Sequence, residues 1–217
     1  MKAKRPAKKP TTKKAAPRTQ EQRRRDTQER VLTAAIDILA DRGYAHLTTT
    51  AVAAKAGVSR GAQENYFPTK TDLIAAATAH AMDEAIRQAM LAADRGSKAK
   101  DPLPSFLEHN SAFFGSRTYL AMIELALAGR DSRPLLRIHR NAFARFRKEH
   151  DKVWIDALTV AGYERSRAQQ FVELTIYLLR GLSLTKLILP QPVPTKSLLA
   201  RWQSMAAELL DAPGRTN

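Results

Sequence analysis

The sequence lacks cysteine altogether. Disulfide scaffolds, thiolate metal sites and cysteine nucleophiles are therefore excluded. The chain also lacks any apolar run approaching the ~18 residues that cross a bilayer, and no apolar signal-peptide core follows the first methionine. We therefore expect a cytoplasmic protein with no membrane partner.

Several motifs of common enzymes are missing as well. There is no G-x-G-x-x-G sequence, no Walker loop and no H-E-x-x-H sequence. The five histidines show no spacing typical of metal ligands. We therefore expect a protein that is not an enzyme and that has no cofactor and no bound metal.

Acidic residues are scarce relative to basic ones. The chain has 36 Lys and Arg against 21 Asp and Glu, for a net charge of +15. Much of the excess lies in residues 1–25, which contain eleven basic residues and one acid. Residues 1–24 are rich in Lys, Ala and Pro and predict a disordered tail. Such a tail attracts phosphate backbones by counterion release, and the alternative is a solubilising tail.

The rest of the chain predicts an all-α fold. Proline is absent from 18–67 and from 135–189, and apolar residues recur at three- and four-residue spacing. Thr19 and Gln22 form a capping box that opens a helix ending near Arg42. Counting their capping residues, further helices are expected at about 48–55, 59–66, 69–94, 104–115, 117–128, 133–161, 164–189 and 195–211.

Residues 48–67 have the pattern of a helix-turn-helix motif. Ala53 is small where two crossing helices approach closely, and Gly57 permits a positive φ at the turn. Val58 then fills the corner, and Ser59 can cap the second helix. In such motifs the second helix enters the major groove of DNA. The alternative is an ordinary helical hairpin.

This region resembles the TetR family of bacterial transcriptional regulators. The resemblance rests on Val31-Leu32-x-Ala34-Ala35, Gly43-Tyr44, Thr48-Thr49, Val52-Ala53-x-x-Ala56-Gly57-Val58-Ser59-x-Gly61, Tyr66-Phe67-Pro68-Thr69-Lys70 and Asp72-Leu73-Ile74. It implies an N-terminal three-helix DNA-binding domain in residues 25–84. It also implies a helical effector-binding and dimerisation domain in residues 85–217. A homodimer, a palindromic operator in double-stranded DNA and an unidentified small-molecule effector follow as expected partners.

The resemblance also implies which residues contact DNA. Arg60 matches the leading base reader, because an Arg at the start of the recognition helix can form a bidentate pair with guanine. Thr50 and Ala62 match other positions that face the groove. The expected DNA contacts are Thr48, Thr49, Thr50, Ser59, Arg60, Gly61, Ala62, Asn65, Tyr66 and Lys70. For Thr49 and Ser59 the alternative is a purely structural role as helix caps.

Two residues depart from the family pattern. Gln63 occupies a position that is usually aliphatic and turned inward. Glu64 stands where the family often has a phosphate-binding Tyr. DNA would repel this carboxylate unless it points away or pairs with a neighbouring Arg.

The C-terminal half predicts a ligand pocket. The expected lining is aromatic, with His109, Asn110 and Glu124 as polar anchors, and ordinary core packing is the alternative. The candidate pocket residues are Phe106, His109, Asn110, Phe113, Tyr119, Glu124, Phe143, Phe146 and Tyr177. His139 and His150 lie on a basic helix and are expected to be solvated.

The last two helices predict a dimer interface. Residues 164–189 carry two apolar stripes, and 195–211 repeat this arrangement, whereas a surface helix needs one stripe. The candidate interface residues are Phe171, Leu174, Leu178, Leu182, Leu198, Trp202, Met205 and Leu209. The alternative is burial within one monomer.

The sequence therefore favours a DNA-binding regulator, as a repressor that a small molecule releases from a palindromic operator. The first alternative is a nucleoid-type protein that coats DNA with low specificity and has no effector. The second is a helical enzyme with an appended DNA-binding motif. Specific binding separates the first two, because a regulator prefers its operator over random DNA by a factor of about 10³ or more.

Overall fold

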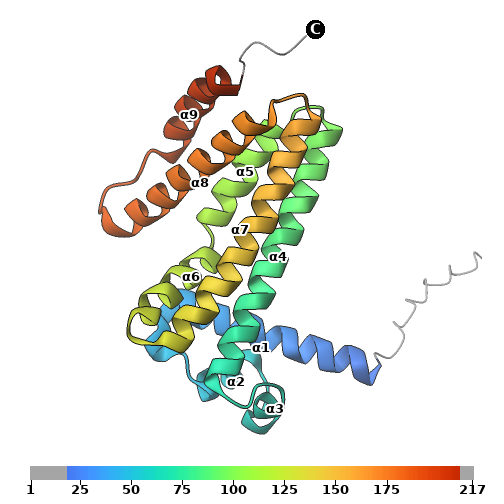
Figure 1. Ribbon diagram of the computed structural model, residues 1–217. Helices are drawn as coiled ribbons and strands as arrows, with labels where there is room; N and C mark the ends of the chain where they lie inside the picture. The colour runs from blue at the N-terminus through green and yellow to red at the C-terminus, as the bar shows by residue number, and fades with distance from the viewer. Residues whose placement is uncertain (1–18, 211–217) are drawn as a thin grey trace, which may run out of the picture.

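The computed structural model describes residues 19–210, and this part of the chain contains helices and no strand. The all-α prediction is confirmed (Figure 1). The elements are α1 Gln20–Arg42, η1 Tyr44–His46, α2 Thr49–Ala56, α3 Arg60–Tyr66, α4 Lys70–Lys98, α5 Pro102–Phe114, α6 Arg117–Ala128, η2 Gly129–Asp131, α7 Arg133–Val160, α8 Arg165–Ile188 and α9 Thr195–Leu210.

The capping box at the start of α1 is confirmed. The Thr19 side chain accepts a hydrogen bond from the Gln22 amide at 3.2 Å, and the Gln22 side chain accepts one from the Thr19 amide at 2.9 Å. The sequence analysis placed residues 20–24 both in the tail and in this helix, and they form the first turns of α1. The remainder of the predicted tail, residues 1–18, lies outside the described residues.

Helices α4 and α7 form the long axis of the molecule and lie side by side along it (Figure 1). Much of the buried face of α4 is made of alanine side chains, which let neighbouring helices approach closely. These are Ala77, Ala81, Ala85, Ala89, Ala92 and Ala93. Because α4 is continuous from Lys70 to Lys98, the expected domain boundary after residue 84 falls inside a helix.

Two helix boundaries around the α4–α5 turn differ from the sequence-based expectation. Helix α4 continues past Asp94 to Lys98, and α5 begins at Pro102. Proline is tolerated in the first turn of a helix because its missing N–H would have no intrahelical partner. Gly96 permits the close turn, since a Cβ there would lie 2.9 Å from the Pro102 Cα.

A cluster of buried aromatic rings joins α5, α7 and α8. The ring centres of Phe106 and Trp154 lie 5.2 Å apart, and those of Phe106 and Phe171 lie 5.1 Å apart. All three side chains are fully buried. This cluster provides the core of the C-terminal part, with α9 packed on α8.

Candidate functional site

The helix-turn-helix predicted for residues 48–67 is present as α2 and α3. Gly57 adopts the left-handed conformation, with φ 65° and ψ 41°, and ends α2. The Thr48 hydroxyl accepts from the Ala51 amide at 3.1 Å to cap α2. The Ser59 hydroxyl accepts from the Ala62 amide at 3.2 Å to cap α3. Both caps are therefore structural as well as candidate phosphate contacts.

The letters Gly57-x-Ser59-x-Gly61 also match the nucleophile elbow of α/β-hydrolases. That motif requires a strand before the serine and a helix after it. Here α2 precedes Ser59, and its hydroxyl caps α3. The local geometry is that of the helix-turn-helix turn.

Helix α3 lies at the end of the molecule farthest from the α8–α9 hairpin (Figure 1). Most of the candidate DNA contacts are exposed there: Thr48, Thr50, Ser59, Arg60, Gly61 and Asn65. The others are half-buried: Thr49, Ala62, Tyr66 and Lys70. The motif therefore presents the start of α3 to an external partner.

Arg60 and Glu64 form an ion pair on the outer face of α3. The Arg60 Nε donates to the Glu64 carboxylate at 2.7 Å. This hydrogen bond raises the pKa of the Arg60 guanidinium above its ordinary value. An exposed pair of this kind contributes little to stability. It does compensate the charge of Glu64 and leaves the two Nη groups of Arg60 for other partners.

Tyr66 and Lys70 both contact neighbouring side chains of the protein. The Lys70 ammonium lies 3.9 Å from the Tyr44 ring centre, and partial burial lowers the pKa of Lys70. The Arg24 guanidinium lies 5.7 Å from the Tyr66 ring centre. For Lys70 to bind a phosphate, its ammonium must turn away from Tyr44.

Gln63 points inward, as its aliphatic family counterpart does, and is fully buried. Its Nε2 donates to the Phe67 carbonyl at 3.2 Å, whereas its Oε1 is buried without a hydrogen-bond partner among the described residues. A buried acceptor without a partner costs about 1–3 kcal/mol.

We expect Gln63→Met to stabilise the protein, because it replaces this unsatisfied amide with an apolar chain of similar length. The expected gain is about 1 kcal/mol, or roughly 2–4 °C in Tm. Thermal unfolding measures it, and DNA affinity serves as a control that should stay unchanged. A lower Tm would show that the hydrogen bond to Phe67 outweighs the unsatisfied oxygen.

Several cavities open in the C-terminal part, and two of them are lined by aromatic side chains together with a histidine. The larger, of about 320 Å³, lies between α4, α5 and the start of α6. It is lined by Ala81, Glu84, Ala85, Gln88, His109, Ala112, Phe113, Ser116 and Thr118. The smaller, of about 160 Å³, lies between α6, α7 and α8. It is lined by Tyr119, Met122, Ile123, Ala126, His139, Phe143 and Arg180.

The candidate pocket residues are distributed over both cavities and the core. His109 and Phe113 line the larger cavity, and Tyr119 and Phe143 line the smaller one. Three candidates are instead fully buried core residues: Phe106, Asn110 and Phe146. Tyr177 is 55% exposed on α8. The sequence did not indicate Met122, Ile123 or Arg180 as lining residues.

Three further expectations are corrected. Glu124 does not line either cavity, and its carboxylate lies 3.0 Å from the position of a Cβ at Gly43. His150 is fully buried and His139 is half-buried, so neither is freely solvated. Burial also lowers the pKa of His109 to about 4, which makes this ring neutral at pH 7.

Within residues 19–210, no group of three or more His, Asp or Glu side chains is arranged to hold a metal ion. No helix in the same range is both long enough and apolar enough to span a membrane.

Comparison with known proteins agrees with this geometry. Residues 31–77 match the family model described as bacterial regulatory proteins, tetR family. Residues 31–77 are thus a TetR-family DNA-binding region. It is similar to the HTH-type transcriptional regulator CymR of Pseudomonas putida, with 28% identity over 78% of this chain and 84% of the relative. This TetR-family chain is therefore a DNA-binding transcriptional regulator.

Solved structures share the fold of this TetR-family regulator. A chain from a Rhodococcus species, assigned to the same family, superposes with a TM-score of 0.68 and 21% identity over 86% of this chain and 100% of that chain. The multidrug binding protein EbrR, solved with imidazole, gives a TM-score of 0.55 and 22% identity. The match covers 88% of this chain and 98% of EbrR. At these identities the likeness concerns the fold alone.

In this TetR-family chain, an ion-pair network joins the DNA-binding helices to α6. Arg117, at the start of α6, contacts Asp41 at 2.5 Å and Asp37 at 3.2 Å, both on α1. Lys55 of α2 lies 3.7 Å from each of the same carboxylates. The hydrogen bond from Arg117 lowers the pKa of Asp41 below its ordinary value. Helix α6 thus contacts α1 at one end while lining the smaller cavity further along.

The candidate interface residues of α8 and α9 divide into inner and outer faces. Phe171 and Leu182 are buried within the chain, which contradicts a surface role. Trp202 also turns inward, where its ring stacks 6.2 Å from Phe171 and its Nε1 donates to the Thr175 hydroxyl at 2.7 Å. Leu178, Leu198 and Leu209 are half-buried against the core, and Leu174 and Met205 are exposed.

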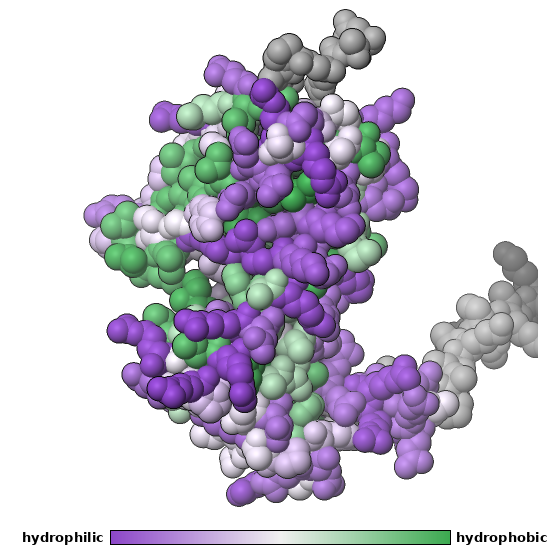
Figure 2. Space-filling model, in the orientation of Figure 1, coloured by the Kyte–Doolittle hydropathy of each residue, from purple (hydrophilic) through white to green (hydrophobic). Residues whose placement is uncertain are grey.

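The outer face of α8 carries an exposed stripe. Of the interface residues predicted on this helix, the stripe includes Leu174. Leu174, Tyr177, Gly181, Leu184 and Ile188 recur at alternating spacings of three and four residues. We call these five residues the outer α8 stripe. Figure 2 shows hydrophobic surface gathered on the left of the molecule, where Figure 1 places α8 and its turn into α9. Exposed apolar surface of this kind is typical of an interaction site.

Proposed function

We propose that this regulator is a homodimeric repressor that leaves a palindromic operator when a small-molecule effector binds its C-terminal part. The observation that carries the proposal is the position of α6. Tyr119 and Ile123 of α6 line the smaller cavity, and Arg117 of the same helix forms ion pairs with α1. An occupant that displaces α6 would therefore also displace the DNA-binding helices.

The outer α8 stripe supports the homodimer. An apolar stripe at three- and four-residue spacing suits packing against another helix. A second copy related by a two-fold axis presents the same stripe, and the paired recognition helices then read two half-sites of opposite orientation. The palindromic operator follows from that symmetry.

The two cavities support ligand binding. The smaller is lined mainly by apolar and aromatic side chains with two polar groups, as small-molecule sites are. The larger combines four apolar side chains with five polar ones. The multidrug binding protein EbrR, which shares the fold, was solved with imidazole and also with malachite green. We extend ligand binding from that protein to this one on the basis of the cavities.

In the proposed complex, Arg60 reads a base and the neighbouring polar residues hold phosphates. Arg60 is exposed at the first position of α3, with its Nη groups unoccupied by Glu64. Thr50, Ala62 and Asn65 complete the groove-facing surface. The remaining contacts are assigned to the DNA backbone: Thr48, Thr49, Ser59, Gly61, Tyr66 and Lys70.

Genome-wide DNA affinity selection with the purified protein tests the proposal. We expect one or a few palindromic sites that bind about 10³-fold or more tightly than random DNA. Transcription from a promoter carrying the selected site should fall when the protein is added. Equal recovery of all sequences would instead support the nucleoid-type alternative, and activation of the promoter would contradict the repressor.

We expect deletion of residues 1–18 to weaken binding to all DNA while operator choice is retained. The deletion removes eight Lys and Arg residues. The slope of log affinity against log salt should become shallower by up to ~0.9 for each residue that meets a phosphate. Fluorescence anisotropy over a salt series measures this slope, with a variant carrying Gln at the eight basic positions as the matched control. An unchanged slope would show that the tail does not contact DNA.

A further inference from the structure

No carboxylate among the described residues forms an ion pair with Arg180 of α8. Its Nε and Nη2 atoms are buried and make no hydrogen bond to the described residues. Its guanidinium carbon lies 4.9 Å from the ring centre of Phe143, 5.6 Å from that of Tyr177 and 5.8 Å from that of Phe114. The guanidinium is thus surrounded by aromatic rings and is not paired with a carboxylate.

Asp151, the carboxylate whose charge acts on Arg180, is already paired with two other side chains. Asp151 accepts a hydrogen bond from Arg147 at 2.8 Å and lies 3.3 Å from the His150 ring nitrogen. Burial and the neighbouring Arg147 lower the pKa of Arg180, but a guanidinium remains charged at neutral pH. A partly buried charge without a partner is costly, which indicates that the site is built for an anion.

The unpaired atoms of Arg180 define what kind of anion fits. Nε and Nη2 lie along one edge of the planar guanidinium, and their N–H groups point in parallel. Two parallel donors match the two oxygens of a carboxylate and form a bidentate pair. A halide ion would have to share one acceptor atom between the two donors, whereas a carboxylate offers each donor its own oxygen.

The cavity beside Arg180 defines the rest of the ligand. Its volume is about 160 Å³, and Tyr119, Ile123 and Phe143 provide apolar walls. His139 adds one polar atom, because its Nδ1 is buried without a partner among the described residues. Burial lowers the pKa of His139, so this ring is neutral at pH 7 and can donate a hydrogen bond without adding charge. The space suits one ring or a short branched chain.

We propose that the effector is a small organic acid whose carboxylate pairs with the Nε–Nη2 edge of Arg180 and whose apolar body fills the cavity between α6, α7 and α8. This inference rests on the proposed function and specifies the class of its effector. The Nε and Nη2 atoms of Arg180 are covered in the free protein, so the guanidinium must turn toward the cavity that it lines to meet the carboxylate. Cationic ligands are disfavoured, because Arg180 and Arg147 both flank Tyr177.

Calorimetric titration with three sodium salts tests the proposal: benzoate, phenylacetate and cinnamate. Benzamide and benzylamine are the matched neutral and cationic probes. We expect at least one of the acids to bind the full-length protein, and the amide and the amine to bind roughly 10- to 100-fold more weakly. Failure of all three acids to bind more tightly than benzamide would overturn the proposal.

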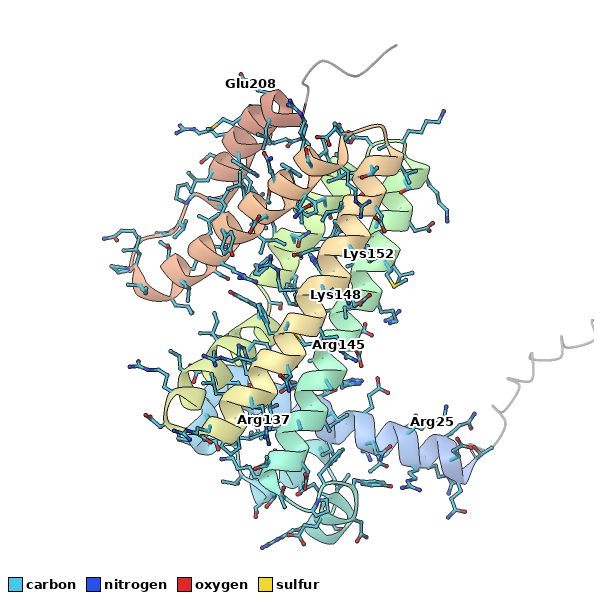
Figure 3. All side chains as sticks on the ribbon, in the orientation of Figure 1. Arg25, Arg137, Arg145, Lys148, Lys152 and Glu208 are labelled. Carbon is cyan, nitrogen blue, oxygen red and sulfur yellow. The ribbon has the colours of Figure 1, made fainter. Side chains whose placement is uncertain are left out.

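Arg180→Gln should weaken binding of the acid by roughly 10- to 100-fold. The acid affinity of Arg180→Lys should lie between those of the wild type and Arg180→Gln, because Lys keeps the charge but not the paired donors. The control is Arg145→Gln on the exposed side of α7, where Figure 3 labels it between Arg137 and Lys148 and where it pairs with Asp83. This control should leave acid binding unchanged. Equal affinity of wild type and Arg180→Gln for the acid would overturn the proposal.

The stability and the dimerisation of Arg180→Gln distinguish a bound acid from a carboxylate of the second copy as the partner of Arg180. Without ligand, this variant should have a Tm equal to or above that of the wild type, since it removes an uncompensated charge. A weaker dimer in this variant would show that a carboxylate of the second copy is the true partner of Arg180, and would overturn the proposal.

Operator release by the acid then tests the proposed function independently. If the acid binds through Arg180 but operator affinity is unchanged, the ligand class stands and effector-driven release fails. If a ligand of another class releases the operator equally from wild type and Arg180→Gln, the release mechanism stands and the organic acid is overturned as the effector.

Discussion

Leu184→Glu should convert the dimer to a monomer and abolish operator binding. Leu184 is 42% exposed in the outer α8 stripe, one helical turn beyond its central residue, Gly181. In the proposed dimer, the two Glu side chains would be buried close to each other across the two-fold axis, without partners of opposite charge. We expect dimerisation to weaken by about 100-fold or more, and cooperative binding to the two half-sites to disappear with it. Sedimentation velocity and anisotropy with operator DNA measure the two effects.

Met90→Glu is the matched control for Leu184→Glu. Met90 is 56% exposed on α4, outside the outer α8 stripe, so this change adds the same charge to an apolar position. It should leave the dimer and operator binding intact, and circular dichroism confirms that both variants remain folded. A wild type that sediments as a monomer at micromolar concentration would refute the dimer. A Leu184→Glu variant that stays dimeric would refute the outer α8 stripe as the dimer interface.

Arg60→Ala should weaken specific binding by about 1–3 kcal/mol and relax the preference at one base pair in each half-site. Random DNA should be bound almost as before. Affinities for the operator, for operators with single substitutions and for random DNA measure the change. An equal fall on operator and random DNA would show that Arg60 contacts a phosphate.

Glu64 complicates this measurement, because Arg60→Ala leaves its carboxylate uncompensated beside DNA. The double variant Arg60→Ala with Glu64→Ala separates lost base reading from added repulsion. Arg87→Ala is the matched control, since Arg87 forms a similar exposed pair with Glu84 on α4. This control should change neither affinity nor sequence preference.

The features that were predictable from the sequence depend on residues close together in the chain. The capping box of Thr19 and Gln22 fixes the start of α1, and Gly57 fixes the turn of the helix-turn-helix. Both depend on hydrogen bonds or backbone angles within a few residues, so the local sequence contains all the information. The pairing of Glu64 with Arg60 belongs to the same class, at a separation of four residues.

The features that were not predictable depend on helices far apart in the chain. Arg180 is singled out only when Phe143 and Phe114 are brought around it. Trp202 resembled an interface residue until its hydrogen bond with Thr175 was seen, across 27 positions. His150 lies on a basic helix, and only the tertiary arrangement of α5 and α7 buries it against His109. Helical periodicity indicates that a face is apolar but not which neighbour covers it.

The unbroken course of α4 has a mechanical consequence. Its 29 residues form a rod about 43 Å long, and its Lys70 end follows α3 after a short link. A tilt of about 5° around the Lys98 end sweeps the Lys70 end through an arc of about 4 Å, close to the ~3.4 Å rise of one base pair. In a two-fold dimer the two rods would swing in opposite senses. A change of a few degrees beside the cavities would then suffice to put both recognition helices out of step with the DNA.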